Sequence, residues 1–399
     1  MHWLPIRRKT DRGHGMHIVG GLYRELCDVP FWDSTLGSGG RAALAANALA
    51  SGVEFSTYAS PADRSALVSL ESQGIITHAA TRPSPIVFAY FHPLSSPHIE
   101  PPRASINREN SISVTGNAVL RFGFLEGDAV VTANRAVYDP QTWHNPPSFG
   151  ANGSTARELA LVMNELEVRQ ITGIDELHLA AQHLLKKQRA QVVVIKQGAR
   201  GASVYEGVGK ISHIPAYRSS SVFKIGTGDI FTAVFAVHWA QGELPPHQAA
   251  DLASRSVSVY CDTRAFEFDE SILKQRQPIS SWRGGRVRLE GGVDSLGQRY
   301  TMEEARFALR ELGVDVTCPQ IEVANAGWNT DATLVINDEL SVESLARIAE
   351  DRARSIPIIT LHERTTAASV LTVATETTDD FTTAMYLAVW AAGEAAATH

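Results

Sequence analysis

The chain has little cysteine, no long apolar run and no excess of positive charge. Its three cysteines, Cys27, Cys261 and Cys318, are odd in number and lack metal-ligand spacing, which argues against a disulfide framework or a zinc site. No segment combines the length and the apolarity of a membrane span. The formal net charge of -7 gives no electrostatic reason to expect nucleic acid or an anionic membrane as a partner. We therefore expect a cytoplasmic protein that binds neither nucleic acid nor membranes.

The remaining composition is that of a globular protein. Of the 399 residues, 44% are hydrophobic and 20% are charged, so the chain is long enough for two or three domains with buried cores. Residues 1–15 are basic and polar and lack the apolar centre of a secretory signal, so we expect them to form a loose N-terminal extension.

From residue 16 onward, strand-like and helix-like segments alternate, which predicts a layered α/β fold. A first strand ends in Gly20-Gly21 and leads into a polar turn that contains Glu25. A glycine-rich loop with Gly39 and Gly40 then precedes an alanine-rich helix from Ala42 to about residue 50. Such a loop can admit a ligand or permit close packing.

A β-rich pattern covers residues 85–125, which we interpret as a β lid or as an edge extension of the main sheet. We interpret His92 and His98 within it as exposed loop histidines. Two strands are expected between residues 129 and 139, and an apolar core strand at residues 191–196 leads into a turn with Gly198 and Gly201.

A linker is predicted at residues 277–285, where a proline, serines and a glycine pair occur together. It separates a first domain, residues 16–276, from a second, residues 286–399. The second has the strand and helix order of a small Rossmann-like, or flavodoxin-like, α/β unit. Its first helix is expected to start at a capping box of Thr301 and Glu304.

The stretch Gly226-Thr227-Gly228-Asp229 stands at the start of an apolar helix that runs to about residue 241. Two glycines at a helix start expose backbone N–H groups, and the helix dipole adds a positive end, so this stretch can cradle an anion. A carboxylate beside a phosphate would repel it, but the carboxylate can accept the proton of an attacking hydroxyl group. Alternatively, Asp229 only caps the helix and the glycines only shape a turn.

Four features in one order resemble the PfkB, or ribokinase-like, family of carbohydrate and nucleoside kinases over residues 16–268. They are the strand ending in Gly20-Gly21, the Gly39-Gly40 loop, the pair Asn164 and Glu167, and Gly226-Thr-Gly-Asp229. The resemblance implies a three-layer α/β/α fold with a β lid.

The resemblance also implies a role for each matching residue. Asp229 would be the catalytic base, and the amides of Gly226, Thr227 and Gly228 would form an anion hole for the transferring phosphoryl group. Asn164 and Glu167 would organise Mg²⁺ through water. The other implied residues bind ATP on one side, namely Lys196, Gly198, Gly201 and Lys224, and the substrate on the other, namely Glu25, Gly39 and Gly40.

The chain departs from the family at three places, one of which is Glu25, a longer residue than the aspartate that is usual there. Phe223-Lys224-Ile225 replaces the Asp-Thr-Thr that commonly supports a monovalent-cation loop, and Ala43 replaces the asparagine that binds the sugar. We hypothesise that the ammonium group of Lys224 supplies the charge of the lost cation, so that activity does not respond to K⁺. A solvent-facing lysine is the alternative.

The stretch from Arg286 to about residue 363 is similar to the nucleoside 2-deoxyribosyltransferases, which use a glutamate nucleophile on a later helix. Aligning residues 341–349 with that helix places Arg347 at the glutamate and Ser341 at a supporting aspartate, while Glu343 lies one helical turn away. Because arginine cannot be the nucleophile, we favour a non-catalytic domain that binds a nucleoside or forms an oligomer. A packing module without a ligand is the alternative.

Taken together, we expect an ATP- and Mg²⁺-dependent phosphotransferase that acts on a hydroxyl, in particular a hydroxymethyl group, of a sugar or nucleoside-like molecule. We also expect a homo-oligomer. Two alternatives stay open: a nucleotide-binding sensor or scaffold with weak turnover, and deoxyribosyltransferase or hydrolase activity in the C-terminal domain.

Overall fold

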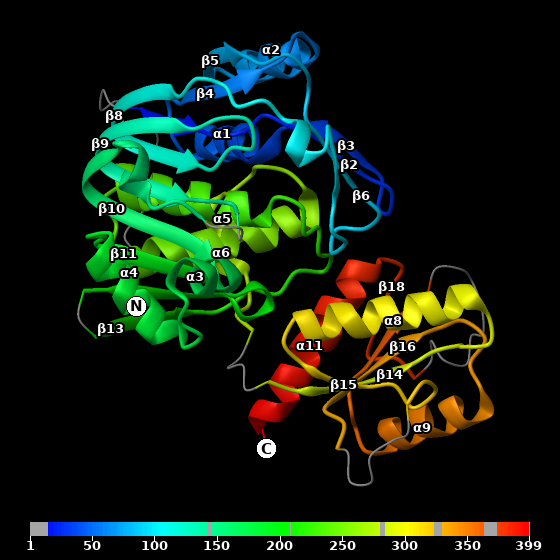
Figure 1. Ribbon diagram of the computed structural model, residues 1–399. Helices are drawn as coiled ribbons and strands as arrows, with labels where there is room; N and C mark the ends of the chain where they lie inside the picture. Colours follow the sequence, from blue (N-terminus) through cyan, green and yellow to red (C-terminus); the bar gives the residue numbers. More distant parts are fainter. Residues whose placement is uncertain are drawn as a thin grey trace.

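The computed structural model describes residues 15–142, 146–207, 209–279, 284–322, 329–362 and 373–398. They form two units, which we call the N-terminal unit (residues 15–279) and the C-terminal unit (residues 284–398) (Figure 1). Most of the expected N-terminal extension (residues 1–14) and the middle of the expected linker (residues 280–283) lie outside the described residues. Within the described ranges, no helix combines the length and the apolarity that crossing a membrane requires.

A nine-stranded sheet is the centre of the N-terminal unit. All neighbours from β11 to β5 are parallel, and β11, β12 and β13 pair antiparallel at one edge. Residues 129–139, expected as two strands, form one continuous strand. In spatial order the strands are β13 (Lys210–Ile214), β12 (Ala202–Glu206), β11 (Val192–Lys196), β10 (Thr155–Asn164), β9 (Ala129–Asp139), β8 (Ile112–Phe122), β1 (Met16–Val19), β4 (Glu54–Ala59) and β5 (Ile76–Thr81).

Helices cover both faces of this sheet, so the prediction of a layered α/β fold is confirmed. Because side chains alternate along a strand, Val192 and Val194 of β11 enter one buried core whereas Val193 and Ile195 enter the other. The first core contains α1 (Gly37–Leu49), α5 (Thr227–Ala236) and α6 (Pro246–Thr263), and the second contains α3 (Glu165–Thr172) and α4 (Leu177–Lys187). The shorter α2 (Arg64–Ser72) packs against β5, and α7 (Glu270–Gln275) packs against α6.

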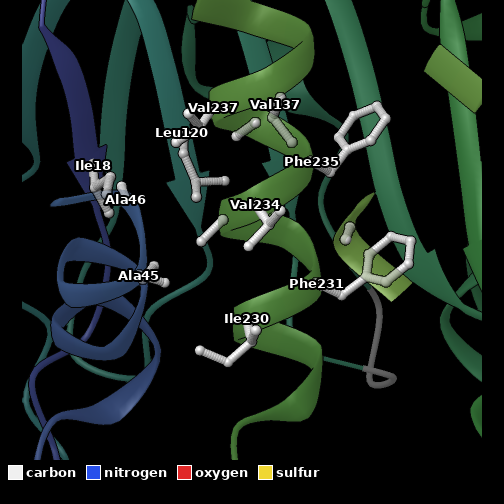
Figure 2. Close-up of a cluster of buried hydrophobic side chains, with 14 of the residues drawn as sticks. Ile18, Ala45, Ala46, Leu120, Val137, Ile230, Phe231, Val234, Phe235 and Val237 are labelled. Carbon is white, nitrogen blue, oxygen red and sulfur yellow. The ribbon is translucent and has the colours of Figure 1, made fainter. Parts of the chain in front are cut away.

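Helix α5 is buried along most of its length and continues as a π-helical turn, Val237–Gln241. Figure 2 shows Ile230 and Val234 on the side of α5 that faces α1 and the strands, and Phe231 and Phe235 on its other side. An apolar surface on all sides fixes α5 in the core. The position of its first turn, which carries Asp229, is therefore set by packing.

A second, four-stranded sheet has the order β3 (Trp32–Thr35), β2 (Arg24–Cys27), β6 (Val87–Tyr90) and β7 (His98–Glu100). The β-rich stretch of residues 85–125 is thus divided, because β6 and β7 join this sheet while β8 joins the main one. The prediction that Glu25 lies in a turn is wrong. Glu25 and Cys27 are the buried positions of β2, and a charged residue at a buried position hid the strand periodicity.

The C-terminal unit contains five parallel strands in the order β15 (Asp315–Thr317), β14 (Arg286–Glu290), β16 (Ala332–Ile336), β17 (Ile358–Leu361) and β18 (Glu376–Thr378). In chain order this is 2-1-3-4-5, a doubly wound arrangement. Its helices include α8 (Leu296–Glu311), α9 (Val342–Ala353) and α11 (Phe381–Thr398). The predicted capping box of Thr301 and Glu304 is wrong, because Ser295 and Gln298 form the capping box and start α8 earlier.

The two units are in direct contact. His92, which we expected to be exposed, is buried: its Nε2 lies 3.0 Å from Oε1 of Glu304 on α8, and its ring packs on Phe381 of α11. That partner lies 212 residues away in the sequence, so the local pattern around His92 could not reveal it. The C-terminal unit therefore touches the segment that follows β6.

Candidate active site

Three polar residues end neighbouring parallel strands at one edge of the main sheet. β9 ends at Asp139, β10 at Asn164 and β11 at Lys196, and the register pairs Asn164 with Lys196. Helix α5 reaches the same edge, because the Thr232 hydroxyl in its middle donates to Asp139 over 2.8 Å and a Cβ atom added to Gly228 at its start would lie 3.6 Å from Nζ of Lys196. Ligands of open α/β sheets bind at this edge.

Asp229 lies in the first turn of α5 and is 9% exposed. Its Oδ2 accepts a hydrogen bond from Nη1 of Arg41 at 2.8 Å, and its Oδ1 accepts one from Nε2 of Gln141 at 2.6 Å. Neither Arg41 nor Gln141 was predicted from the sequence as a site residue. Arg41 directly follows the Gly39-Gly40 pair, and Gln141 follows the strand that ends at Asp139, so both stood beside features that had already been noted.

Arg41 is completely buried and joins Glu25 to Asp229. Its Nη1 and Nη2 donate to the two carboxylate oxygens of Glu25, and its Nε donates to the Tyr260 hydroxyl at 3.2 Å. Tyr260 in turn donates to the carbonyl oxygen of Ile225 at 3.1 Å, in the segment just before Gly226. Glu25, predicted to bind the substrate, and Asp229, predicted to be the base, are thus brought together by the guanidinium group of Arg41.

Burial and Arg41 act in opposite directions on these two carboxyl groups. Burial raises the pKa of Asp229 above its ordinary value, and the positive charge of Arg41 opposes that rise. Burial also raises the pKa of Glu25, again against Arg41. Because arginine stays protonated, Arg41 favours the ionised forms of Glu25 and Asp229 at a site that is shielded from solvent.

Two lysines stand at the same helix start. Nζ of Lys196 lies 2.5 Å from Oδ2 of Asp139, and a Cβ atom added to Gly228 would lie 3.6 Å from that Nζ. Nζ of Lys224 donates to the Thr227 hydroxyl at 3.0 Å. Burial lowers the pKa of Lys224, whereas Asp139 and Glu167 outweigh burial at Lys196 and raise its pKa. The Thr227 amide donates to the carbonyl oxygen of Lys224 at 3.3 Å, so it closes the turn before α5. We call Lys196, Lys224 and the amide of Gly228 the anion cradle.

Several glycines of the motif are required by close packing. A Cβ atom added to Gly226 would overlap the Arg41 side chain, and Gly226 has a φ of 82°, which favours glycine. A Cβ atom added to Gly39 would lie 2.7 Å from the carbonyl oxygen of Gly20. Helix α1 begins at Gly37, not at Ala42, so Gly39 and Gly40 are buried within its first turn. Glycine suits that turn because the end of β1 passes directly against it.

Asn164 and Glu167 form a capping box at the start of α3. Oδ1 of Asn164 accepts from the Glu167 amide, and Oε2 of Glu167 accepts from the Asn164 amide, both at 2.8 Å. Burial and the nearby charge of Asp139 raise the pKa of Glu167 to about 7. In the described part of the chain, no three histidine, cysteine or carboxylate side chains are grouped as a direct metal cage. Two neighbouring carboxylates beside the cradle suit a divalent ion that is held through water.

The turn after β11 contains Gly198 and Gly201. Gly201 has a φ of 87°, and a Cβ atom there would overlap the backbone of Ile214. Between them, Ala199 is buried, and its carbonyl oxygen accepts a hydrogen bond from Nε1 of Trp390 on α11 at 3.0 Å. The turn that was expected to hold a nucleotide is therefore in contact with the C-terminal unit.

In the C-terminal unit, Arg347 makes a two-pronged ion pair with the fully buried Glu290. The distances are 2.6 Å from Nε to Oε1 and 2.9 Å from Nη2 to Oε2. Ser341 caps α9 by accepting from the Ser344 amide at 3.1 Å, and Glu343 is exposed. An arginine that is bound to a carboxylate stands where the resemblance would place a nucleophile.

Comparison with known proteins gives one family and one curated relative. Residues 157–264 match the family model "pfkB family carbohydrate kinase". A 5-dehydro-2-deoxygluconokinase of Listeria innocua is 28% identical over 138 residues, which is 33% of this chain. The chain spans 42% of the length of that relative.

Two ribokinases are among the solved structures that are similar to this chain. The ribokinase of Thermotoga maritima is 17% identical with a TM-score of 0.47, covering 66% of this chain and all of its own. The ribokinase of Giardia lamblia is 15% identical with a TM-score of 0.49, covering 65% of this chain and 99% of its own.

Proposed function

We propose that this chain, which contains a domain of the pfkB carbohydrate kinase family, transfers a phosphoryl group from a polyphosphate donor to a hydroxyl group of a sugar or a related small molecule. One observation carries the proposal. Asp229 and the anion cradle share the start of α5, with Lys196 beside Gly228 and Lys224 bonded to Thr227. A base and a phosphate site at one helix start are what transfer to a hydroxyl group requires.

In this proposal, the Asp229 carboxylate accepts the proton of the acceptor hydroxyl. The ion pair with Arg41 does not prevent this, because each carboxylate oxygen can accept two hydrogen bonds. Arg41 orients Asp229 and helps to keep it ionised. Glu25, with Gly39 and Gly40 behind it, borders the acceptor side.

The cradle stabilises the negative charge that develops on the transferring phosphoryl group. The amide of Gly228 and the two ammonium groups are in place at the start of α5 before the reaction, so little reorganisation is needed. The family implies ATP and a divalent metal. Glu167 and Asp139, with Asn164 beside them, would hold Mg²⁺ through water, and the ion would neutralise phosphate charge.

We take the acceptor class from the curated relative, whose name specifies a keto sugar acid. Arg41 is a cation on the acceptor side that could attract an acidic substrate, but its charge is already paired with the carboxylates of Glu25 and Asp229. A substrate screen should therefore include both neutral sugars and sugar acids. We also infer the domain limits 16–276 and 286–399 and a non-catalytic C-terminal domain. A homo-oligomer and a cytoplasmic location stay predictions.

The testing experiment is a transfer assay on the full chain, with sugars, sugar acids and nucleosides as acceptors and both ATP and inorganic polyphosphates as donors. The products are identified by mass spectrometry. We expect one acceptor class to gain a phosphoryl group with the wild-type chain and not with Asp229→Asn. Failure of every acceptor with every donor, or product that persists in Asp229→Asn, would contradict the proposal.

A second candidate is a ligand-binding protein with negligible turnover. It is favoured by the same ion pairs, because Arg41 neutralises Asp229 and fills space beside it. This candidate predicts phosphate binding at the cradle without any phosphorylated product.

A further inference from the structure

Helix α11 of the C-terminal unit packs against the N-terminal unit. Figure 1 shows α11, in red, on the side of the C-terminal sheet that faces the N-terminal unit. One buried apolar cluster spans the boundary. It combines Ala199, Val222, Cys261 and Ile279 of the N-terminal unit with residues of α11 that include Met385, Tyr386, Val389 and Trp390.

Helix α11 covers the two segments that flank the cradle. The first is the turn after Lys196, where Trp390 donates to Ala199 and a Cβ atom added to Gly198 would lie 4.0 Å from the Tyr386 hydroxyl. The second is the segment before Gly226, where the Val222 amide donates to the Thr383 hydroxyl at 2.9 Å. Both hydrogen bonds are made by buried groups, so they belong to a packed interface.

The direction of transfer determines where a nucleoside would have to lie. The acceptor hydroxyl approaches on the Asp229 side, and in-line displacement places the leaving group on the opposite side of the cradle. A nucleobase on that side needs apolar surface against which to stack. The apolar side chains beside the cradle, Ala199, Val222 and Cys261, are only 2%, 4% and 5% exposed because α11 already covers them.

Helix α11 cannot leave this place alone. Its alanines at positions 384, 388 and 392 are fully buried in the core of its own unit, and the helix packs on β14, β16 and β17. Clearing the surface would require the whole C-terminal unit to separate. That separation would break the ion pairs of Arg218 with Glu376 and Glu394 and the contact between His92 and Glu304.

We propose that the phosphoryl donor of this chain is a short inorganic polyphosphate, such as pyrophosphate, and that the C-terminal unit excludes nucleoside triphosphates by occupying the nucleoside side of the donor site. This proposal rests on the proposed kinase function. In the step, the acceptor oxygen forms a bond to phosphorus, the bond to the bridging oxygen breaks, and the hydroxyl proton passes to Asp229. With pyrophosphate the products are a phosphate monoester and inorganic phosphate, and with a longer donor the leaving group is the polyphosphate shortened by one phosphate.

The test compares tripolyphosphate with ATP, because the two carry similar phosphate chains and differ by adenosine. Calorimetry on the full chain with Mg²⁺ measures both dissociation constants, and adenosine is added as a competitor. We expect tripolyphosphate to bind at least tenfold more tightly than ATP, and adenosine to displace neither ligand. The proposal would be overturned if the affinity for ATP came within tenfold of that for tripolyphosphate or exceeded it, if adenosine displaced ATP, or if neither tripolyphosphate nor ATP bound.

A variant locates the binding at the cradle. Lys196→Met should weaken tripolyphosphate binding at least tenfold, whereas Lys210→Met, a matched change on the exposed strand β13, should not change it. Equal binding in both variants would overturn the assignment to the cradle. These binding measurements do not depend on turnover. The proposed kinase function would be contradicted by the absence of a phosphorylated product. The proposed donor would be contradicted if the adenosine group of ATP contributed to its affinity.

Discussion

Replacing Arg41 by methionine should destabilise the chain in a manner that depends on pH. Arg41 is completely buried, and its guanidinium group is the cation that pairs with both Glu25 and Asp229. Methionine fills similar space without charge, so the variant leaves two buried carboxyl groups without their cation. Removing one partner of a buried ion pair costs about 3–5 kcal/mol.

The pH dependence follows from the two carboxyl groups. Without Arg41 their pKa values in the folded chain rise further above those in the unfolded chain, because burial already raises both and the opposing charge is lost. Neutralising one such group costs about 4 kcal/mol at pH 7 and about 1 kcal/mol at pH 5. A raised carboxyl pKa favours folding at low pH and opposes it as the pH rises. Between pH 7 and pH 5, the deficit of Arg41→Met should therefore shrink by about 3 kcal/mol for each of the two carboxyl groups that the variant neutralises.

Urea unfolding of the full chain, followed by fluorescence at both pH values, measures this deficit. Arg41→Lys keeps the charge and should lose less stability. Adding Glu25→Gln and Asp229→Asn to Arg41→Met removes the unpaired charges and should recover much of the loss. A deficit below about 1 kcal/mol at pH 7, or one that does not change with pH, would refute the view that Arg41 holds these carboxylates ionised.

Three further predictions concern the neighbouring residues. Glu167→Gln keeps a side chain that can complete the capping box but cannot ionise. Because burial raises the pKa of Glu167 to about 7, the wild-type chain should lose up to about 3 kcal/mol of stability relative to this variant as the pH rises from about 4.5 to 7. A stability difference in urea unfolding that does not change with pH would count against this prediction. Gly226→Ala should lower the unfolding midpoint, because the new methyl group overlaps Arg41 and the φ of 82° is strained for alanine; an unchanged midpoint would show that the turn relaxes freely. Addition of K⁺ should leave the transfer rate unchanged, because Lys224 is bonded to Thr227 at the cradle; a strong increase in rate would disprove the charge replacement.

Much of the fold could be predicted because the signals were local. The apolar segment of β11 and the glycine turn before α5 gave strands and helices close to those observed. The proposed base and anion site could be placed at one helix start because Gly226-Thr-Gly-Asp229 is a continuous stretch. Strands were expected up to residue 139, and parallel-sheet geometry could have assigned their last residue, Asp139, to the same edge as Lys196.

The remainder depends on long-range contacts. Arg41 and Asp229 are 188 residues apart, so a buried arginine between two carboxylates has no local signature. The spacing of Asn164 and Glu167 suits both a helix capping box and a pair of residues that organise a metal ion. The sequence pattern alone therefore did not reveal that the two residues cap α3. Likewise, nothing local at Ala199 or Val222 indicates that α11 of the C-terminal unit covers them.

We propose Asp229 as the base of a phosphoryl transfer. The most direct measurement is the turnover rate of Asp229→Asn relative to the wild-type chain, on the acceptor and donor that the transfer assay identifies, with polyphosphate affinity measured in parallel. We expect turnover to fall about 10²–10⁴-fold, because a positioned general base contributes about that much. We also expect an unchanged or tighter polyphosphate affinity, because the substitution removes a negative charge beside the cradle. Turnover within tenfold of the wild-type value, in a variant that still binds polyphosphate, would contradict it.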